Sequence, residues 1–342
     1  MGAEFYRPVD TPLGWAGGGT RLVYLHEEQY ANEDVREPAC GASGIYETDG
    51  RSPPRPLVTG RAWCDTGESA ALTPDGRTIL SARGVWEGAC GKLHALDLRR
   101  RAWRTLIHTC AAYLEEPVPS PVDDVVVVRL TCPVEMGGGE PTHRKPAGCT
   151  GWPDPEWRLL RMDGTGLRPF GRTGDHSPAW SPEGRRIAVV RKGGGIDVVE
   201  RESGRRVSLA DGEEPAWSGD GRWIAFVRGD RASDALRVIG ADGSGERVVF
   251  TNRARGSYSN GWGRAPEGIP SDPLWSQDGR RIVFARNYRT GYTLWSVDVD
   301  GGNLRQIAPI LPAALPAAES PRNRAARMHA SQASRHSLHH HS

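Results

Sequence analysis

Acidic side chains and one histidine recur at one place in this sequence, a few residues before a tryptophan or its replacement. Carboxylates that converge concentrate negative potential, and can hold Ca²⁺ or a basic segment of a partner. A histidine or carboxylate beside a bound metal can instead move a proton in catalysis. Short polar residues at this place can also simply end loops by bonding nearby amides. The candidates are Asp10, Glu68, Glu115, Glu116, His176, Glu213, Glu214 and Asp272.

Four tryptophans form a second group of candidates, because they fall in glycine-rich or long connecting segments. An exposed indole can stack on a sugar ring or anchor a protein partner. The same side chain can equally fold back and fill the interior of its own loop, and both readings stay open. These residues are Trp63, Trp86, Trp152 and Trp262.

The six cysteines all lie in the first half of the chain. An even count indicates disulfide bonds, and the pairs favoured by proximity in sequence are Cys132–Cys149, Cys40–Cys64 and Cys90–Cys110. Free thiols in a cytoplasmic protein are the alternative. A zinc site is disfavoured because no Cys-x-x-Cys spacing occurs. The first residues contain no apolar segment of a signal peptide, so we expect a leader to have been removed if the cysteines are bridged.

A repeated segment indicates which elements position these residues. Three copies are clear: 178–190 (PAWSPEGRRIAVV), 215–227 (PAWSGDGRWIAFV) and 273–285 (PLWSQDGRRIVFA). Three weaker copies begin at Trp15, Leu72 and Pro119. Every copy except the one at Pro119, which keeps only the outline, places a Gly-containing turn before an apolar run. This pattern is typical of antiparallel strands, and further Asp-Gly turns follow. Four strands per unit, at spacings of 37 to 61 residues, are the sequence signature of a propeller blade.

The repeat resembles that of the TolB-like propellers, whose core is Pro-x-Trp-Ser-Pro-Asp-Gly followed by an apolar strand. The resemblance covers residues 8 to 309 and implies a propeller with a central channel, often with a periplasmic or secreted binding role. It supplies no catalytic motif, because the repeated residues build structure. We therefore predict an all-β, six-bladed β-propeller of four-stranded antiparallel blades over residues 1–309. Its blades start near residues 8, 66, 113, 174, 211 and 270, and residues 310–342 form a disordered tail or tag.

The order of strands a, b, c and d in each blade places the connections b–c and d–a at one rim of the disc. The long insertions fall in this class, at 26–43, 83–91, 131–156 and 251–271. Such long loops are uncommon unless they are functional or disordered. The cysteines, the four candidate tryptophans, His26 and His143 map to the same rim. The sequence therefore predicts that function resides on this b–c/d–a face.

The net charge of +2 gives no basis for binding nucleic acid, and no apolar segment is long enough to insert into a membrane. The sequence favours a non-catalytic, extracytoplasmic propeller, periplasmic or secreted and monomeric. It would bind a protein or glycan partner through the disulfide-braced loop face, with Ca²⁺ as a possible cofactor. The alternative is a metal-assisted polysaccharide lyase or hydrolase with its site at the channel mouth.

Overall fold

The repeated segment folds into a turn whose geometry is set by its own side chains. In the fifth copy, Asp220 Oδ1 accepts bonds from the Ser218 hydroxyl (2.6 Å) and the Arg222 amide (3.1 Å). The Trp223 amide donates to Ser218 Oγ, at 3.0 Å. Gly221 completes the turn with a φ of 69°, a left-handed conformation that glycine adopts without steric cost. Short polar residues and one glycine therefore reverse the chain between the first two strands of a blade.

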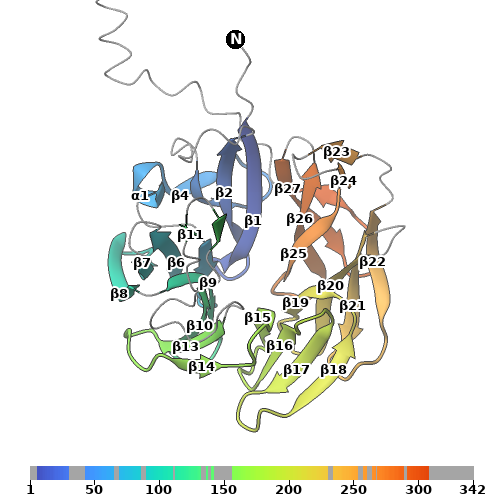
Figure 1. Cartoon of the computed structure of the whole chain (residues 1–342). Coiled ribbons are helices and arrows are strands. Elements are labelled where there is room, and N and C mark those ends of the chain that lie inside the picture. The colour runs from blue at the N-terminus through green and yellow to red at the C-terminus, as the bar shows by residue number, and fades with distance from the viewer. Residues whose placement is uncertain are drawn as a thin grey trace, which may run out of the picture. The chain divides into compact units, whose positions relative to one another are not determined.

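The computed structural model describes residues 6–30, 43–64, 69–85, 90–110, 112–131, 136–137, 140–141, 156–229, 234–252, 257–259, 264–266, 268–288 and 291–307. It contains six four-stranded antiparallel sheets, each made of strands consecutive along the chain apart from small inserted hairpins. The predicted six-bladed β-propeller is confirmed, and Figure 1 shows the blades arranged in a ring.

The first three blades follow the pattern of four strands, with one helical turn and one hairpin added. Blade 1 contains β1 (Tyr6–Ala16), β2 (Arg21–Tyr30), β3 (Gly44–Thr48) and β4 (Arg55–Thr59), followed by α1 (Arg61–Cys64). Blade 2 contains β5 (Ser69–Leu72), β6 (Thr78–Val85), β7 (Cys90–Asp97) and β8 (Ala102–Cys110). Blade 3 contains β9 (Tyr113–Pro119), β10 (Val125–Thr131), β13 (Glu156–Arg161) and β14 (Arg168–Phe170), with the hairpin β11 (Met136–Gly137) and β12 (Glu140–Pro141) inserted.

The last three blades are the most regular in sequence and in structure. Blade 4 contains β15 (His176–Trp180), β16 (Arg186–Val190), β17 (Ile196–Glu200) and β18 (Arg206–Ala210). Blade 5 contains β19 (Glu213–Trp217), β20 (Trp223–Gly229), β21 (Asp234–Gly240) and β22 (Arg247–Asn252). The hairpin β23 (Ser257–Ser259) and β24 (Arg264–Pro266) precedes blade 6, which contains β25 (Pro270–Trp275), β26 (Arg281–Tyr288), β27 (Gly291–Asp298) and β28 (Arg305–Gln306).

The ring closes through contact between the first and last blades, without a shared sheet. The first strands of neighbouring blades contact one another all the way round, and β1 also packs on β27. Tryptophan side chains connect the blades in series, because each donates from Nε1 to a backbone carbonyl of the preceding blade. These bonds run from Trp180 to Val118, from Trp217 to Ala179, from Trp275 to Ala216 and from Trp15 to Trp275, at 2.8–3.2 Å.

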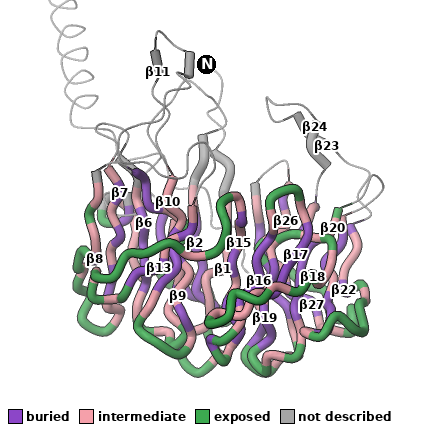
Figure 2. Tube along the Cα trace, turned by 60° about the horizontal axis from the view of Figure 1, so that its bottom comes forward, coloured by how far each residue is buried: buried purple, intermediate pink, exposed green. Residues whose placement is uncertain are grey.

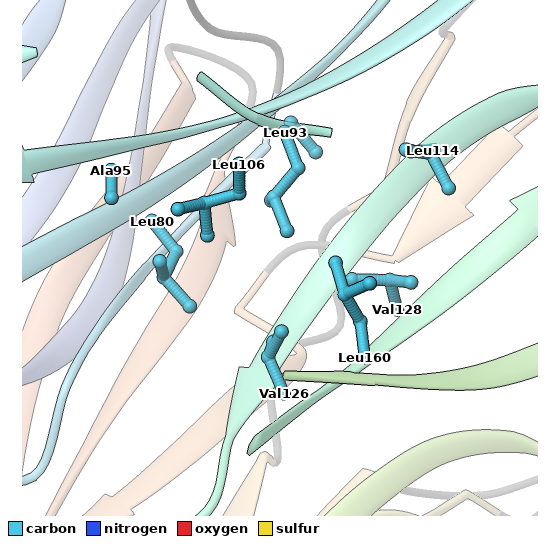
Figure 3. Packing of buried hydrophobic residues seen from close by; sticks show 9 residues of the cluster. Leu80, Leu93, Ala95, Leu106, Leu114, Val126, Val128 and Leu160 are labelled. Carbon is cyan, nitrogen blue, oxygen red and sulfur yellow. The ribbon is translucent and has the colours of Figure 1, made fainter. Parts of the chain in front are cut away.

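The apolar core lies between the blades, where alternate residues of facing sheets pack together. Figure 3 shows one such contact, in which Leu80 and Leu93 of blade 2 lie near Leu114 and Val126 of blade 3. The anchors Trp180, Trp217 and Trp275 are buried, as the repeat predicts. Exposed residues, green in Figure 2, gather at the turns and along the outer strands β8, β18 and β22. Within the described residues, no helix has the length and apolar character needed to cross a membrane.

Candidate functional site

Four blades carry the same irregularity in their innermost strand, near its start. The strand register shifts after Glu115 in β9, His176 in β15, Glu213 in β19 and Ser271 in β25. In each case one following residue, without being glycine, has a left-handed backbone. These residues are Glu116 (φ 47°), Ser177 (49°), Glu214 (53°) and Asp272 (51°). The fold therefore repeats a β-bulge at this point of blades 3 to 6.

This conformation is unfavourable for residues that have a side chain. It costs on the order of 1–3 kcal/mol for each residue, and it persists only where the surrounding structure imposes it. Bulges redirect side chains, and they are frequent beside functional sites. Here they are located at the start of strand a, on the side of the b–c and d–a connections. We call this region the channel mouth and define it by Ser69, Glu115, Glu116, His176, Ser177, Glu213, Glu214 and Asp272.

The bulge residues connect neighbouring blades round the mouth. The Glu116 amide of blade 3 donates to Ser69 Oγ of blade 2, at 3.0 Å. The Asp272 amide of blade 6 donates to Glu214 Oε2 of blade 5, at 2.7 Å. In both cases the side chain from one blade reaches the bulged backbone of the next blade. Of the mouth residues named from the sequence, Glu214 and Asp272 therefore come together in space across blades 5 and 6.

Glu214 and Asp272 form an acidic pair across the joint of blades 5 and 6. Burial raises the pKa of Glu214 to about 7, and repulsion from Asp272 and then Glu213 adds to the effect. Burial also raises the pKa of the Asp272 carboxyl, although the residue as a whole is exposed at the surface. No cationic side chain among the described residues forms an ion pair with Glu213, Glu214 or Asp272. Within the described residues, blades 5 and 6 therefore present negative charge at the mouth that no ion pair compensates.

The acidic residues of blade 3 are neutralised instead. Arg129 of β10 forms ion pairs with Glu115, at 3.6 Å, and with Glu116. Thr131 Oγ1 also donates to Glu115 Oε2, at 2.9 Å. Counting back from the turn at 120–124 places Arg129 opposite Glu116, and the bulge moves it opposite Glu115. The hairpin pattern would therefore have identified Arg129 as the partner of these two glutamates. The negative potential of the mouth is consequently concentrated on its blade 5 and 6 side.

Asp10 does not belong to the accessible mouth, and the expectation that it binds a ligand there is wrong. It is 4% exposed and contacts His26 Nδ1 at 2.7 Å, because the pairing of β1 with β2 sets these two residues opposite each other. Burial raises the pKa of Asp10, while the bond to His26 opposes that shift. The pair is a buried structural contact of blade 1.

His176 lies at the mouth, half-buried, with Nδ1 3.3 Å from Ser177 Oγ. Glu68 lies outside the described residues. The described residues contain no cluster of three or more His, Cys, Asp or Glu side chains that could hold a metal ion. The donors described here are the Glu214 and Asp272 pair, Glu213 without an ion pair, and Glu115 and Glu116 paired with Arg129. This set does not fit a preformed Ca²⁺ site, so we derive no step through a metal.

Of the four candidate tryptophans, the structure describes Trp63 alone. It is 2% exposed and packs in the core between blades 1 and 2, because α1 turns it inward. Trp63 is therefore a residue of the inter-blade core and not part of an exposed binding surface. Trp86, Trp152 and Trp262 lie outside the described residues.

The structure bears on the predicted disulfide bonds at one cysteine, Cys90. Cys90 is disulfide-bonded. Gly91 of β7 is paired with Thr109 of β8, and each strand has one further residue at that end, Cys90 and Cys110. The register is thus compatible with the predicted Cys90–Cys110 bond, which stays a prediction. Cys40, Cys132 and Cys149 lie outside the described residues, as does the Cys64 side chain, so the other two pairs also stay predictions.

The inter-blade hydrogen bonds of Trp15, Trp180, Trp217 and Trp275 form what we call the tryptophan ladder. Together with the sheets and the bulged inner strands, this ladder defines a six-bladed β-propeller with a polar channel mouth. No protein-family model and no curated protein matches the sequence. Solved structures with a similar fold include TolB from Acinetobacter baumannii, with a TM-score of 0.56 and 15% identity, covering 86% of this chain and 78% of that one. A TolB structure from Agrobacterium tumefaciens has a TM-score of 0.53 and 19% identity, covering 75% of this chain and 84% of that one.

An oligogalacturonate lyase in complex with manganese is also similar, with a TM-score of 0.51 and 13% identity, covering 85% of this chain and 90% of that one. At these identities the similarity shows the shared fold alone. TolB proteins and a lyase are both among these neighbours, so the fold does not decide the function and the site residues must.

Proposed function

We propose that this propeller is a non-catalytic binding protein whose partner is a polypeptide held at the channel mouth. In this proposal, the acidic pair Glu214 and Asp272 receives a Lys or Arg side chain of the partner. The observation that carries the proposal is the hydrogen bond from the Asp272 amide to Glu214 Oε2, which joins the two acidic residues with no cationic partner in the described part of the chain. A bound ammonium or guanidinium group would supply the missing positive charge and satisfy the carboxylate oxygens.

Without a ligand, the arrangement of Glu214 and Asp272 is energetically unfavourable. Glu214 and Asp272 each adopt a strained backbone, and their like charges are close together. Sites at which a fold retains strain and repelling charges are often sites of function. A cation of the partner would relieve the repulsion, so part of the unfavourable free energy is recovered on binding.

The opposite wall of the mouth explains how a partner would be oriented. Arg129 neutralises Glu115 and Glu116 on blade 3, whereas the three carboxyls on blades 5 and 6 have no ion pair with a described residue. A partner with a cationic residue on one side would therefore be directed toward blades 5 and 6. Charge patterns of this kind determine orientation and specificity more than affinity.

We propose further that the protein acts outside the cytoplasm, in the periplasm or after secretion. The disulfide at Cys90 supports this, because structural disulfides persist in oxidising compartments. The long connections that join β2 to β3, β10 to β13 and β22 to β25 are b–c and d–a segments, so they start and end at the rim of the channel mouth. A protein or glycan partner would contact these loops as well.

The experiment is calorimetric titration with a short peptide of alternating Arg and Gly, and with the same peptide carrying citrulline in place of Arg. We expect saturable binding of the Arg peptide, weakened at least tenfold in the Glu214→Gln variant. The matched control is Glu202→Gln, which changes an exposed glutamate away from the mouth. Equal binding of both peptides, or unchanged binding in Glu214→Gln, would reject the proposal.

A second candidate function rests on the same carboxyl. A group with a pKa near 7 is suited to act as a general acid or base at neutral pH, and His176 lies on the neighbouring blade. The protein would then act on an acidic polysaccharide as a lyase or hydrolase. Incubation with oligogalacturonides, followed by chromatography of the products, decides between the two functions. Cleavage that is lost in Glu214→Gln would establish the enzyme.

A further inference from the structure

A groove of about 460 Å³ lies between blade 1 and blade 6, at the end of the blades that carries the short turns. Blade 1 contributes Trp15, Leu22 and the turn residues 48–51, and blade 6 contributes Val283 and Ser296. This is the joint at which the ring closes. It lies at the opposite ends of the strands from the channel mouth, so it is independent of the site proposed above.

A buried hydroxyl in this groove has no partner. Ser296 of β27 is 3% exposed, and its Oγ forms no hydrogen bond within the described part of the structure. Leaving a buried polar group unsatisfied costs roughly 1–3 kcal/mol. Because Ser296 lines the groove, a ligand in the groove would be within reach of this hydroxyl. The Ser296 hydroxyl can donate one hydrogen bond to an acceptor oxygen of that ligand.

Three guanidinium groups surround the same groove. Arg51, Arg281 and Arg305 line it, and none of the three side chains has an ion pair with any described residue. Some arginines near other turns are paired, as Arg201 is with Asp123 at 2.7 Å and Arg186 is with Glu183 at 2.9 Å. Three arginines without an ion pair to a described residue therefore gather at this joint, beside the unpaired Ser296 hydroxyl.

The one acidic residue in the lining of the groove is already engaged. Asp49 Oδ1 accepts bonds from the amides of Arg51 and Ser52, each at 2.8 Å. These bonds lower the pKa of Asp49, so it stays charged and holds its own turn. Three cations against one anion leave an excess positive charge, beside the apolar side chains of Leu22 and Val283.

We propose that this groove binds a small organic or inorganic anion carrying two or more negative charges. Oxygens of the anion would accept bonds from the arginines and from Ser296 Oγ, and any apolar part would contact Leu22 and Val283. The chemistry is shared by phosphoryl groups and by clustered carboxylates. Because no sheet spans this joint, the bound anion would also tie blade 1 to blade 6 and raise the thermal stability of the ring.

The test is thermal unfolding of the full chain at increasing concentrations of inorganic phosphate or citrate. Sodium chloride at the same ionic strength is the control for each series. We expect a saturable rise in Tm of several degrees with at least one of the two anions. A rise with phosphate alone identifies a phosphoryl site, a rise with citrate alone identifies a carboxylate site, and a rise with both identifies a general polyanion site. No rise beyond that in sodium chloride overturns the proposal.

Two variants test whether the anion that raises Tm binds in this groove. Arg281→Gln combined with Arg305→Gln should abolish the rise, and Ser296→Ala should weaken anion affinity several-fold while leaving the free protein equally stable or more stable. The control is Arg99→Gln, an exposed arginine in the corresponding turn of blade 2. An unchanged anion response in the double variant would also overturn the proposal. The Arg-peptide titration at the channel mouth is unaffected by either result.

Discussion

The backbone amide of Asp272 donates to Oε2 of Glu214, so that the innermost strands of blades 5 and 6 meet at two carboxyl groups. The donated bond stabilises the charged form of Glu214, yet burial and repulsion from Asp272 have a larger effect and raise its pKa to about 7. The pair therefore holds a proton at neutral pH that neither group would hold in the unfolded chain.

The first prediction concerns stability as a function of pH. Because the pKa of folded Glu214 lies above its ordinary value of 4.5, the folded state binds more protons than the unfolded state between about pH 4.5 and pH 7. The contribution of Glu214 to stability is thus full at low pH and lost as pH rises through about 7. Glu214→Gln should raise the free energy of unfolding by about 1–2 kcal/mol at about pH 8, and by much less at about pH 5.

Urea unfolding at both pH values measures this difference, with Glu202→Gln as the control. An equal effect of Glu214→Gln at the two pH values would show that the carboxyl titrates normally.

The second prediction concerns partner binding. A cation favours the ionised acidic pair, so affinity for the Arg peptide should fall as pH decreases through 7, roughly tenfold between about pH 8 and pH 6. Binding should be accompanied by proton release, which appears as a dependence of the calorimetric heat on the buffer. A flat profile over this range would mean that Glu214 is not part of the binding site.

The third prediction concerns the tryptophan ladder. Trp217→Phe keeps an aromatic ring but removes the Nε1 donor, leaving the Ala179 carbonyl without its bond, and should cost about 1–3 kcal/mol of stability. Trp103→Phe is the matched control in an outer strand, where Trp103 is half-buried, and should cost less than about 1 kcal/mol. Similar losses in the two variants would indicate that the inter-blade bond contributes little.

The fourth prediction concerns Cys90. Peptide mapping without reduction should recover Cys90 bonded to Cys110, and Cys110→Ser should reduce stability by about 3 kcal/mol, because the bond closes a loop of about 20 residues. Recovery of Cys90 bonded to another cysteine would reject the pairing. The stability of Cys110→Ser under reducing conditions should match that of the reduced wild-type protein.

The repeat allowed the fold to be predicted because each feature is local. The turn after each anchor depends on residues within a few positions, as Ser218, Asp220 and Gly221 show. The alternation of apolar residues in the following strand then specifies which side chains enter the core between blades. The blade number followed from counting copies of this unit.

The site was only partly predictable, because its chemistry depends on contacts between strands and between blades. Position before the anchor correctly grouped Glu214 with Asp272, which lie far apart in sequence but meet at one joint. The same rule wrongly included Asp10, since pairing with His26 buries it. The left-handed backbone at Glu116, Ser177, Glu214 and Asp272 has no signal in the residue types, because none of them is glycine.

The central claim is tested most directly by a carboxyl-detected NMR titration of Glu214, in the free protein and with the Arg peptide bound. We predict a titration midpoint near 7 in the free protein, moving down by at least about one pH unit when the peptide binds. A midpoint near the ordinary glutamate value in the free protein, or one that the peptide leaves unchanged, would contradict the proposed cation site.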